Sequence, residues 1–347
     1  MIVVNARFLS QPITGVQRYA LEISKRLRIL FDDSELCFLA PPNVVNNKES
    51  AALKVKTVGN FTGHFWEQFE LPFFVKKSDL LINFCNTAPL SVRNKITVIH
   101  DLAYHFDNGW YDKKFKILYQ FLIPRIFQNS KKIVTVSNTV KHEILNQFQN
   151  VQNKNISVIP CTLADDFHQA SSIVKESKLL LCVGSMDPRK NLKNLIKAFD
   201  YIEDKDIILK VVGGSGKSFI QGYSFSEEKS SQIKFLGRVS DEELRILYSK
   251  SYAFIFPSLY EGFGLPPLEA LHFKCVLLGS DIPVFKEIYK DVMVYFNPLD
   301  PKDIASKISY VFSNSKEFSS LKSQKILSKY TLDKSTELWV ELIKNTI

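Results

Sequence analysis

Two glutamates stand with seven residues between them in the stretch SLYEGFGLPPLEA, residues 258–270. Glu261 follows the apolar run YAFIFP, which has the composition of a buried strand, and Glu269 falls in the first turn of the next helix. Two such carboxylates could act as acid and base, or accept hydrogen bonds from the hydroxyl groups of a ligand. A capped turn would explain the glycines and prolines here but not the two acids.

The residues between the two glutamates offer backbone chemistry. Gly262 and Gly264 permit close approach of the backbone. The N–H groups of Phe263, Gly264 and Leu265 would then face whatever the carboxylates hold, and such groups suit ring oxygens or phosphate. The stretch therefore predicts a cradle for a hydroxyl-rich ligand.

A second candidate site lies in LLLCVGSMDPRKNLKNL, residues 179–195. The predicted strand ends at Gly184 and Ser185, and Arg189 and Lys190 precede a helix that begins near Asn191. Two cations beside a helix N-terminus combine point charges with unpaired N–H groups, which favours a diphosphate. A solvated basic loop is the plainer alternative.

Three positions in the first half of the chain follow predicted strands. Gly15 opens a helix and would let an anion approach its N–H groups, although Thr14 before it also reads as an ordinary N-cap. His100 and Asp101 form a polar pair that we expect to be exposed at the end of a strand, where it suits a substrate site. Ser137 we interpret as a helix N-cap.

Two further loops have weaker signals. GGSGKS resembles a phosphate-binding P-loop, but the glycine required five residues before Gly216 is Val211, so the match fails. In KFLGRVSDEEL, Ser240 and Glu243 predict a capping box, and the backbone of Val239 lies where a nucleotide base could bind.

Short apolar runs alternate with helical patterns twice along the chain, which predicts an α/β protein with two doubly wound, Rossmann-like parallel-sheet domains. We place the domains at 1–165 and 166–330, with a polar junction at 165–178 and a last helix at 331–347 that returns toward the first domain. Predicted strands are 2–4, 36–39, 80–84, 96–99, 133–136, 157–159, 179–183, 207–212, 233–236, 253–256, 276–278 and 293–296. Predicted helices include 15–30, 191–201, 241–250 and 267–273.

The 347 residues carry a net charge of +9, and the excess lies in the first half. Residues 1–165 hold 20 basic and 13 acidic side chains, against 25 and 23 in the remainder. The charge could serve nucleic acid, an anionic membrane or a phosphorylated substrate, or be a solvated surface. No nucleic-acid motif accompanies it. Five scattered cysteines indicate reduced thiols in the cytosol, and we expect neither a signal peptide nor a spanning segment.

Together these residues resemble the retaining glycosyltransferases of family 4, which have the GT-B fold of two Rossmann-like domains facing a cleft. The resemblance covers essentially the whole chain, and its most specific element is the E-x7-E motif of Glu261 and Glu269. Supporting matches are TGVQRY (14–19), FWEQFELP (65–72), HD (100–101), VSN (136–138), VGSMDPRKNL (183–192) and FNPLD (296–300).

The resemblance implies the following site residues: catalytic His100, Arg189, Lys190 and Glu261; donor-binding Gly15, Gly184, Ser185, Val239, Phe263, Gly264, Leu265 and Glu269; acceptor-binding Asp101 and Glu67. Glu261 would hold the sugar and Glu269 the ribose, while Arg189 and Lys190 would neutralise the diphosphate. Ser185 departs from the family pattern, which often has arginine there, so we assign that charge to Arg189. Lys290 replaces a usual turn glycine.

The activity implied is metal-independent transfer of a hexose from a nucleotide-diphospho donor to a saccharide or lipid-linked acceptor, without a cofactor. The TGVQRY, FWEQ and PRKN matches resemble mannosyltransferases of bacterial surface polysaccharide synthesis (O-antigen, capsule or exopolysaccharide), which implies GDP-mannose as donor. We expect a cytoplasmic protein in peripheral contact with the anionic inner face of the inner membrane, and no nucleic-acid partner.

Alternative functions stay open on the sequence. The donor could be a UDP-sugar, GDP-fucose or dTDP-rhamnose, and a GT-B fold could also serve a sugar phosphorylase or an epimerase. In another class, the chain could be a basic membrane- or nucleic-acid-binding protein without catalysis. A glutamine at position 261 would leave function intact only in that last case.

Overall fold

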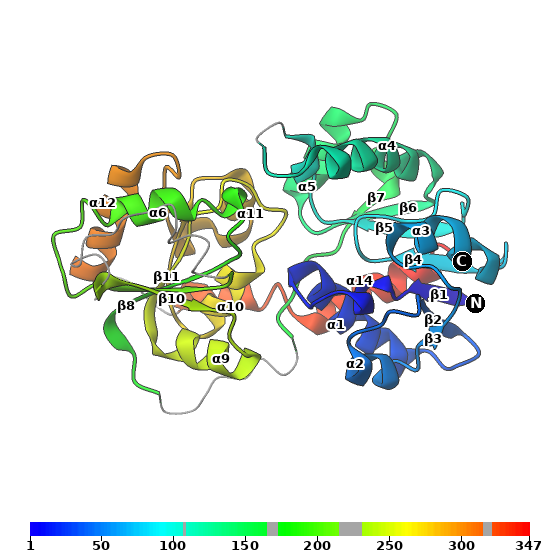
Figure 1. Ribbon diagram of the computed structural model, residues 1–347, viewed down its shortest axis with the longest axis horizontal. Helices are drawn as coiled ribbons and strands as arrows, with labels where there is room; N and C mark the ends of the chain where they lie inside the picture. Colours follow the sequence, from blue (N-terminus) through cyan, green and yellow to red (C-terminus); the bar gives the residue numbers. More distant parts are fainter. Residues whose placement is uncertain (107–108, 165–172, 215–230, 315–320) are drawn as a thin grey trace. The chain divides into compact units, whose positions relative to one another are not determined.

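The computed structural model describes residues 1–106, 109–164, 173–214, 231–314 and 321–347. The chain divides into two compact units (Figure 1). Unit 1 comprises Met1–Asp165 and Tyr330–Ile347, and unit 2 comprises Asp166–Lys329. Residues 165–172 of the predicted junction lie outside the described residues.

Unit 1 is built on a seven-stranded sheet in the order β3-β2-β1-β4-β5-β6-β7, with all neighbours parallel. The first strand lies inside the sheet, as in doubly wound folds, so the strand order reverses beside it. The strands are β1 Ile2–Asn5, β2 Leu36–Ala40, β3 Lys56–Thr57, β4 Leu80–Asn83, β5 Lys95–Ile99, β6 Lys132–Thr135 and β7 Ile156–Val158.

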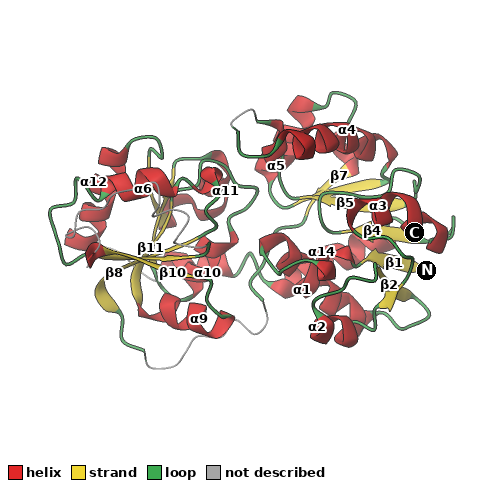
Figure 2. Cartoon of the chain, viewed as in Figure 1, coloured by secondary structure: helices red, strands yellow, loops and turns green. Residues whose placement is uncertain are grey.

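Helices cover both faces of this sheet (Figure 2). They are α1 Gly15–Leu30, α2 Asn47–Ala52, α3 Gly63–Phe65, α4 Lys113–Asn129, α5 Asn138–Gln147 and α14 Leu332–Lys344. The chain continues from α3 through a π-helical turn, Trp66–Glu70, into a 3-10 turn, Leu71–Phe74. Further 3-10 turns are Arg7–Ser10, Ala103–His105 and Asn153–Asn155.

The C-terminal helix α14 is an integral part of unit 1. The indole of Trp339 is fully buried, donates a 2.9 Å hydrogen bond to the Tyr19 hydroxyl in α1 and packs its rings 5.1 Å from Phe84. Ser335 donates to the carbonyl of Pro160. Burial of these aromatic rings with their polar atoms paired fixes the last helix against the first.

Unit 2 repeats the pattern with six parallel strands in the order β10-β9-β8-β11-β12-β13. The strands are β8 Glu176–Val183, β9 Ile208–Val212, β10 Ile233–Gly237, β11 Ser251–Phe256, β12 Val276–Ser280 and β13 Met293–Phe296. The helices are α6 Leu192–Ala198, α9 Asp241–Lys250, α10 Leu265–His272, α11 Pro283–Tyr289, α12 Pro301–Ser313 and α13 Leu321–Leu327, with 3-10 turns at Pro188–Lys190 and Lys290–Val292.

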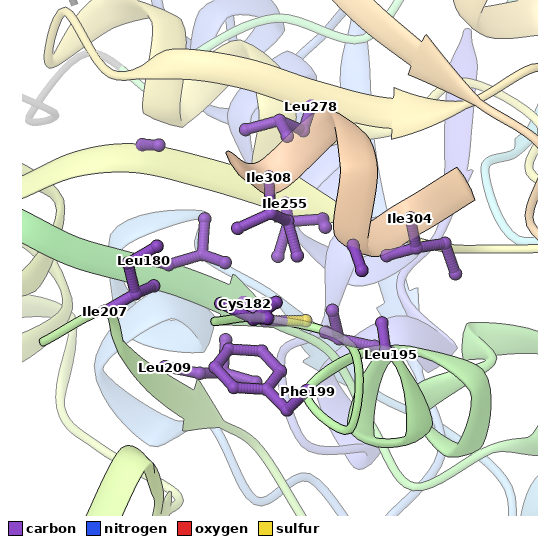
Figure 3. Packing of buried hydrophobic residues seen from close by; sticks show 14 of the residues in the cluster. Leu180, Cys182, Leu195, Phe199, Ile207, Leu209, Ile255, Leu278, Ile304 and Ile308 are labelled. Atoms are coloured by element: carbon purple, nitrogen blue, oxygen red, sulfur yellow. The ribbon is translucent and has the colours of Figure 1, made fainter. Parts of the chain in front are cut away.

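One hydrophobic cluster fills the space between the unit 2 sheet and helices α6 and α12 (Figure 3). Leu180 and Ile255 come from the two central strands, and Leu195, Ile304 and Ile308 from the helices. Each of these side chains is essentially inaccessible to solvent. Such packing holds the ends of the central strands rigidly, and those ends carry the candidate site.

The predicted fold class is confirmed, and the strand predictions hold to within a few residues. The very short strand β3 was not predicted because its two residues, Lys56 and Thr57, are exposed and show no apolar pattern. The helix predicted at 191–201 begins at Leu192 because Asn191 has a left-handed backbone, with φ of 55°. None of the described helices is long and apolar enough to cross a membrane.

Candidate active site

The candidate site of unit 2 forms where β8 and β11 end side by side. These strands pair in parallel, so their following loops leave the same edge of the sheet. The loops are joined by a hydrogen bond from Leu259 N to Arg189 O, 2.8 Å, and by the Asn191 amide, which donates to Pro257 O and Pro298 O. The PRKN and YEGFG segments are therefore held against each other.

Lys190 and Glu261 form a buried ion pair in this position. Lys190 Nζ donates to Glu261 Oε1 at 2.6 Å, and the side chains are only 17% and 10% exposed. The ammonium also lies 4.8 Å from the centre of the Phe256 ring, a favourable cation–π distance. Burial would raise the pKa of Glu261, but attraction to Lys190 and Arg189 outweighs it and lowers that pKa. Glu261 is thus ionised at neutral pH.

The loop around Gly184 brings backbone, not bulky side chains, to the site. Gly213 has φ of 110°, and a Cβ there would lie 2.2 Å from the carbonyl oxygen of Gly184. Only glycine allows this approach between the ends of β8 and β9. A Cβ added at Gly184 would lie 3.6 Å from Cγ of Lys190, an ordinary van der Waals contact. Ser185, two residues past the end of β8, is exposed. The rest of GGSGKS, from residue 215, lies outside the described residues.

Gly264 sets the start of helix α10. It has φ of 90°, and a Cβ there would lie 2.7 Å from the Phe285 ring, so both conformation and space require glycine. Its carbonyl accepts from the Tyr289 hydroxyl. In the described part of the chain, no acceptor pairs with the N–H of Gly264 or Leu265. The helix start therefore presents donors suited to an anion.

Glu269 lies one turn further along α10 and is 7% exposed. Its Oε2 accepts a 2.8 Å hydrogen bond from the Tyr248 hydroxyl of α9. Burial raises the pKa of Tyr248 well above its ordinary value, so the phenol stays protonated and donates. Tyr248 was not anticipated, since nothing in the pattern of α9 distinguishes it from a core aromatic.

The loop between β10 and α9 is as predicted. Ser240 accepts from Glu243 N while the Glu243 carboxylate accepts from Ser240 N, which completes the capping box. Val239 is half-buried between the end of β10 and this cap. Its backbone thus lies at the same sheet edge as Gly213, whose N–H donates to Gly237 O.

In unit 1, Ser137 caps α5 as expected, accepting from Val140 N.

Gly15 in unit 1 has no packing reason to be glycine. It is the first residue of α1, after Thr14, which forms a capping box with Gln17. Its φ is not positive, and a Cβ added there would meet nothing within 4 Å. Thr14 therefore acts as the N-cap of α1, but this cap does not explain why residue 15 is glycine.

His100 is not exposed, which corrects the expectation for the His100–Asp101 pair. Its side chain is buried at the end of β5, edge-on to Tyr19, with ring centres 5.2 Å apart. Nε2 lies 2.7 Å from the carbonyl oxygen of Phe84, which can only accept, so this nitrogen carries the proton. Burial lowers the pKa of His100, leaving a neutral ring with Nδ1 as acceptor. Asp101 is half-buried and accepts from Ala103 N.

Glu67 lies inside a buried polar network of unit 1. It is 1% exposed, and its Oε2 accepts from Arg7 Nε and Asn5 Nδ2, both at 3.0 Å. Arg7 also donates to Thr87. Sequence reasoning missed Asn5 and Arg7, although Asn5 is the last residue of β1 and Arg7 follows it, at the sheet edge where parallel-strand proteins place their sites.

Two family models match the chain. Glycosyltransferase Family 4 matches residues 13–166, and Glycosyl transferases group 1 matches residues 164–331. An O-antigen chain mannosyltransferase, RfbU of Salmonella typhimurium, is 29% identical over 329 residues, covering 89% of this chain and 90% of the relative. O-antigen chain mannosyltransferase B of Escherichia coli is 23% identical, covering 86% of this chain and 87% of its own.

Solved structures give the same fold. Anabaena Alr3699/HepE, solved with UDP and glucose, superposes with a TM-score of 0.75 at 13% identity over 99% of this chain and 98% of that one. The lipopolysaccharide glycosyltransferase WaaG superposes with a TM-score of 0.70 at 13% identity, over 97% and 99%. With the site geometry above and family matches spanning residues 13–331, the chain belongs to the family 4 glycosyltransferases of the GT-B fold.

Proposed function

We propose that this glycosyltransferase transfers mannose from GDP-mannose to a saccharide or lipid-linked saccharide in the synthesis of a bacterial surface polysaccharide such as O-antigen. The similarity to the Salmonella and Escherichia O-antigen mannosyltransferases supports the sugar and the pathway class. The observation that carries the chemistry is the Lys190–Glu261 pair beside Arg189 at the ends of β8 and β11.

In this proposal the cations serve the leaving group. The bond from the anomeric carbon to the β-phosphate oxygen breaks, and negative charge grows on the diphosphate. Arg189, Lys190 and the N–H groups of Gly264 and Leu265 stabilise that charge, which makes departure possible without a metal ion. The acceptor oxygen forms the new bond on the same face, and its proton passes to the departing phosphate. Configuration at the anomeric carbon is retained.

The carboxylates hold the donor and do not shuttle protons. Glu261, kept ionised by its cations, accepts from sugar hydroxyl groups, and Glu269 accepts from the ribose hydroxyls with its orientation fixed by Tyr248. The backbone at Val239 contacts the base, and Gly184 and Ser185 line the diphosphate. In unit 1, Gly15 admits the phosphate to the start of α1, and neutral His100 offers Nδ1 to a hydroxyl of the transferred sugar. Asp101 is assigned to the acceptor.

Glu67 is also assigned to the acceptor side, but through Arg7 and Asn5, because its own carboxylate is buried and paired. We expect no cofactor.

The test is product analysis by mass spectrometry with GDP-mannose, GDP-fucose, dTDP-rhamnose and UDP-glucose, against soluble and lipid-linked acceptors. The proposal expects transfer from GDP-mannose, an unchanged rate in EDTA, and an axial anomeric bond in the product by NMR. Preferred use of a UDP-sugar would overturn the donor assignment, and loss of activity in EDTA would overturn the metal-free mechanism.

A further inference from the structure

The exposed phenylalanines that the structure describes are gathered in one stretch of unit 1. Among the residues that the structure describes, all seven exposed phenylalanines lie between positions 61 and 121 of unit 1. Phe73 is 86% exposed, Phe61 50% and Phe121 49%. Single exposed apolar residues are ordinary on a soluble protein, but a local concentration of aromatic rings marks an interaction surface.

The first part of this surface is the segment 61–77. Rings of Phe61 and Phe65 lie 4.8 Å apart, and those of Phe65 and Phe69 lie 4.7 Å apart, so they form a continuous ridge. The backbone that carries this ridge is anchored to the core, because Trp66 is fully buried and its indole donates to Val58 O. The exposed Lys76 and Lys77 follow directly.

The second part is the outer face of helix α4. Ile117 and Phe121 are exposed one turn apart, with Lys113 and Lys114 at the start of the helix and Arg125 over the Phe121 ring at 3.7 Å. The opposite face of α4 is buried in the unit 1 core. The two parts are neighbours because the His64 ring of α3 contacts the Tyr119 ring of α4, at 6.0 Å.

This surface is cationic because its acids are turned inward or engaged. Residues 113–142 contain no aspartate or glutamate. Within the segment 61–79, Glu67 and Asp79 are buried, and the Glu70 carboxylate accepts from the N–H groups of Asn60 and Phe61. Asp112, the exposed N-cap of α4, accepts from Phe115 N and is outnumbered by the exposed cations Lys76, Lys77, Lys113, Lys114 and Arg125. Exposed aromatic rings beside an excess of cations complement a bilayer, whose interior is apolar and whose headgroup surface is negative.

We propose that segment 61–77 and the outer face of α4 dock this enzyme on an anionic phospholipid bilayer. The rings enter the boundary of the acyl chains while lysine and arginine meet the headgroup phosphates. A second copy of the chain fits less well, since a two-fold contact would set these cations against each other. The inference deepens the proposed function by explaining access to a lipid-linked acceptor, but membrane binding itself needs neither donor nor acceptor.

The experiment is sedimentation of the full chain with vesicles of phosphatidylcholine alone or mixed with phosphatidylglycerol. The wild type should bind the anionic vesicles, less so in high salt, and bind phosphatidylcholine weakly. A triple variant, F61S/F73S/F121S, and a charge variant, K77Q/K113Q/K114Q, should each lower the partition coefficient about tenfold or more. Matched controls at exposed positions outside this surface are I29S/L299S/L338S and K193Q/K197Q/K234Q, which should bind like the wild type.

Failure of the wild type to bind anionic vesicles, or equal binding by the surface variants and the controls, would overturn the proposal. So would a wild-type dimer that F61S/F73S/F121S converts to monomer, because a second copy would then occupy the surface. Circular dichroism confirms folding of each variant. Transfer of the sugar to a soluble saccharide separates the membrane-docking proposal from the transferase proposal. The triple variant should retain this transfer, because it does not need a membrane. If the wild type also shows no transfer, that result counts against the transferase proposal alone.

Discussion

Lys190 Nζ and Glu261 Oε1 lie 2.6 Å apart at the ends of two adjacent strands, although 70 residues separate them in the chain. The pair is buried, and its lysine is one of the two cations assigned to the leaving diphosphate. The same contact lowers the Glu261 pKa and, in the proposed mechanism, would place an ammonium group where negative charge develops.

Replacing Lys190 by methionine should damage both stability and catalysis. Loss of one partner leaves a buried carboxylate, which costs about 3 kcal/mol in the free energy of unfolding. Loss of the charge should lower kcat by about a hundredfold or more. Glu261→Gln is the matched variant: its amide oxygen can still accept from Lys190, so it should lose less stability than Lys190→Met while losing transfer. Full activity in Glu261→Gln would refute the role given to this carboxylate.

Glu67 should make unit 1 sensitive to acid. Burial would raise its pKa, but Arg7 and His64 outweigh that effect and lower the pKa from 4.5 to about 2. A lowered folded-state pKa contributes stability that is fully present above about pH 4.5 and is lost as the pH falls toward 2. The shift corresponds to about 3 kcal/mol.

Urea unfolding measured from pH 6 down to pH 3 tests this linkage. Glu67→Gln should be less stable at pH 6, because Arg7 loses its charged partner, and its stability should fall less steeply with acid than that of the wild type. Glu337→Gln, at an exposed position of α14, should keep the wild-type profile. Parallel profiles for wild type and Glu67→Gln would contradict the assignment.

Gly15→Ala should separate ligand contact from folding. An added methyl group meets no atom within 4 Å, and alanine stabilises a helix relative to glycine, so the melting temperature should stay the same or rise. If α1 approaches the donor phosphate, the same methyl group should raise the Kd for GDP-mannose. Gly264→Ala is the contrast, since it clashes with Phe285 and should lower stability as well. Unchanged donor affinity in Gly15→Ala would remove Gly15 from the site.

The sequence predicted elements better than it predicted contacts. The apolar run Leu179–Val183 identified a central strand, but the structure extends it back to Glu176, since three polar residues continue the strand beyond the apolar run. The sequence predicted that Glu261 follows a strand. Its pairing with Lys190 could not be predicted, because it depends on β8 and β11 being neighbours in the sheet, and no local sequence pattern indicates strand order. His100 was expected to be exposed because polarity was taken as a sign of exposure, yet its ring is paired and buried.

Tyr248→Phe tests whether Glu269 binds the donor. The variant removes the hydroxyl that donates to Glu269 Oε2 at 2.8 Å and preserves the ring stacked on Phe273. An acceptor left without this donor costs about 1–3 kcal/mol, which should appear as modest destabilisation and as looser orientation of the carboxylate. Titration calorimetry should then show weaker binding of GDP, and KM for GDP-mannose should rise while kcat changes little, because the ribose contact is the same in ground and transition states.

Tyr289→Phe, which removes a hydroxyl bonded to Gly264 O without touching Glu269, is the control for a general effect on α10. Equal GDP affinity in wild type and Tyr248→Phe would assign Glu269 to the core of unit 2 and leave the ribose to another residue.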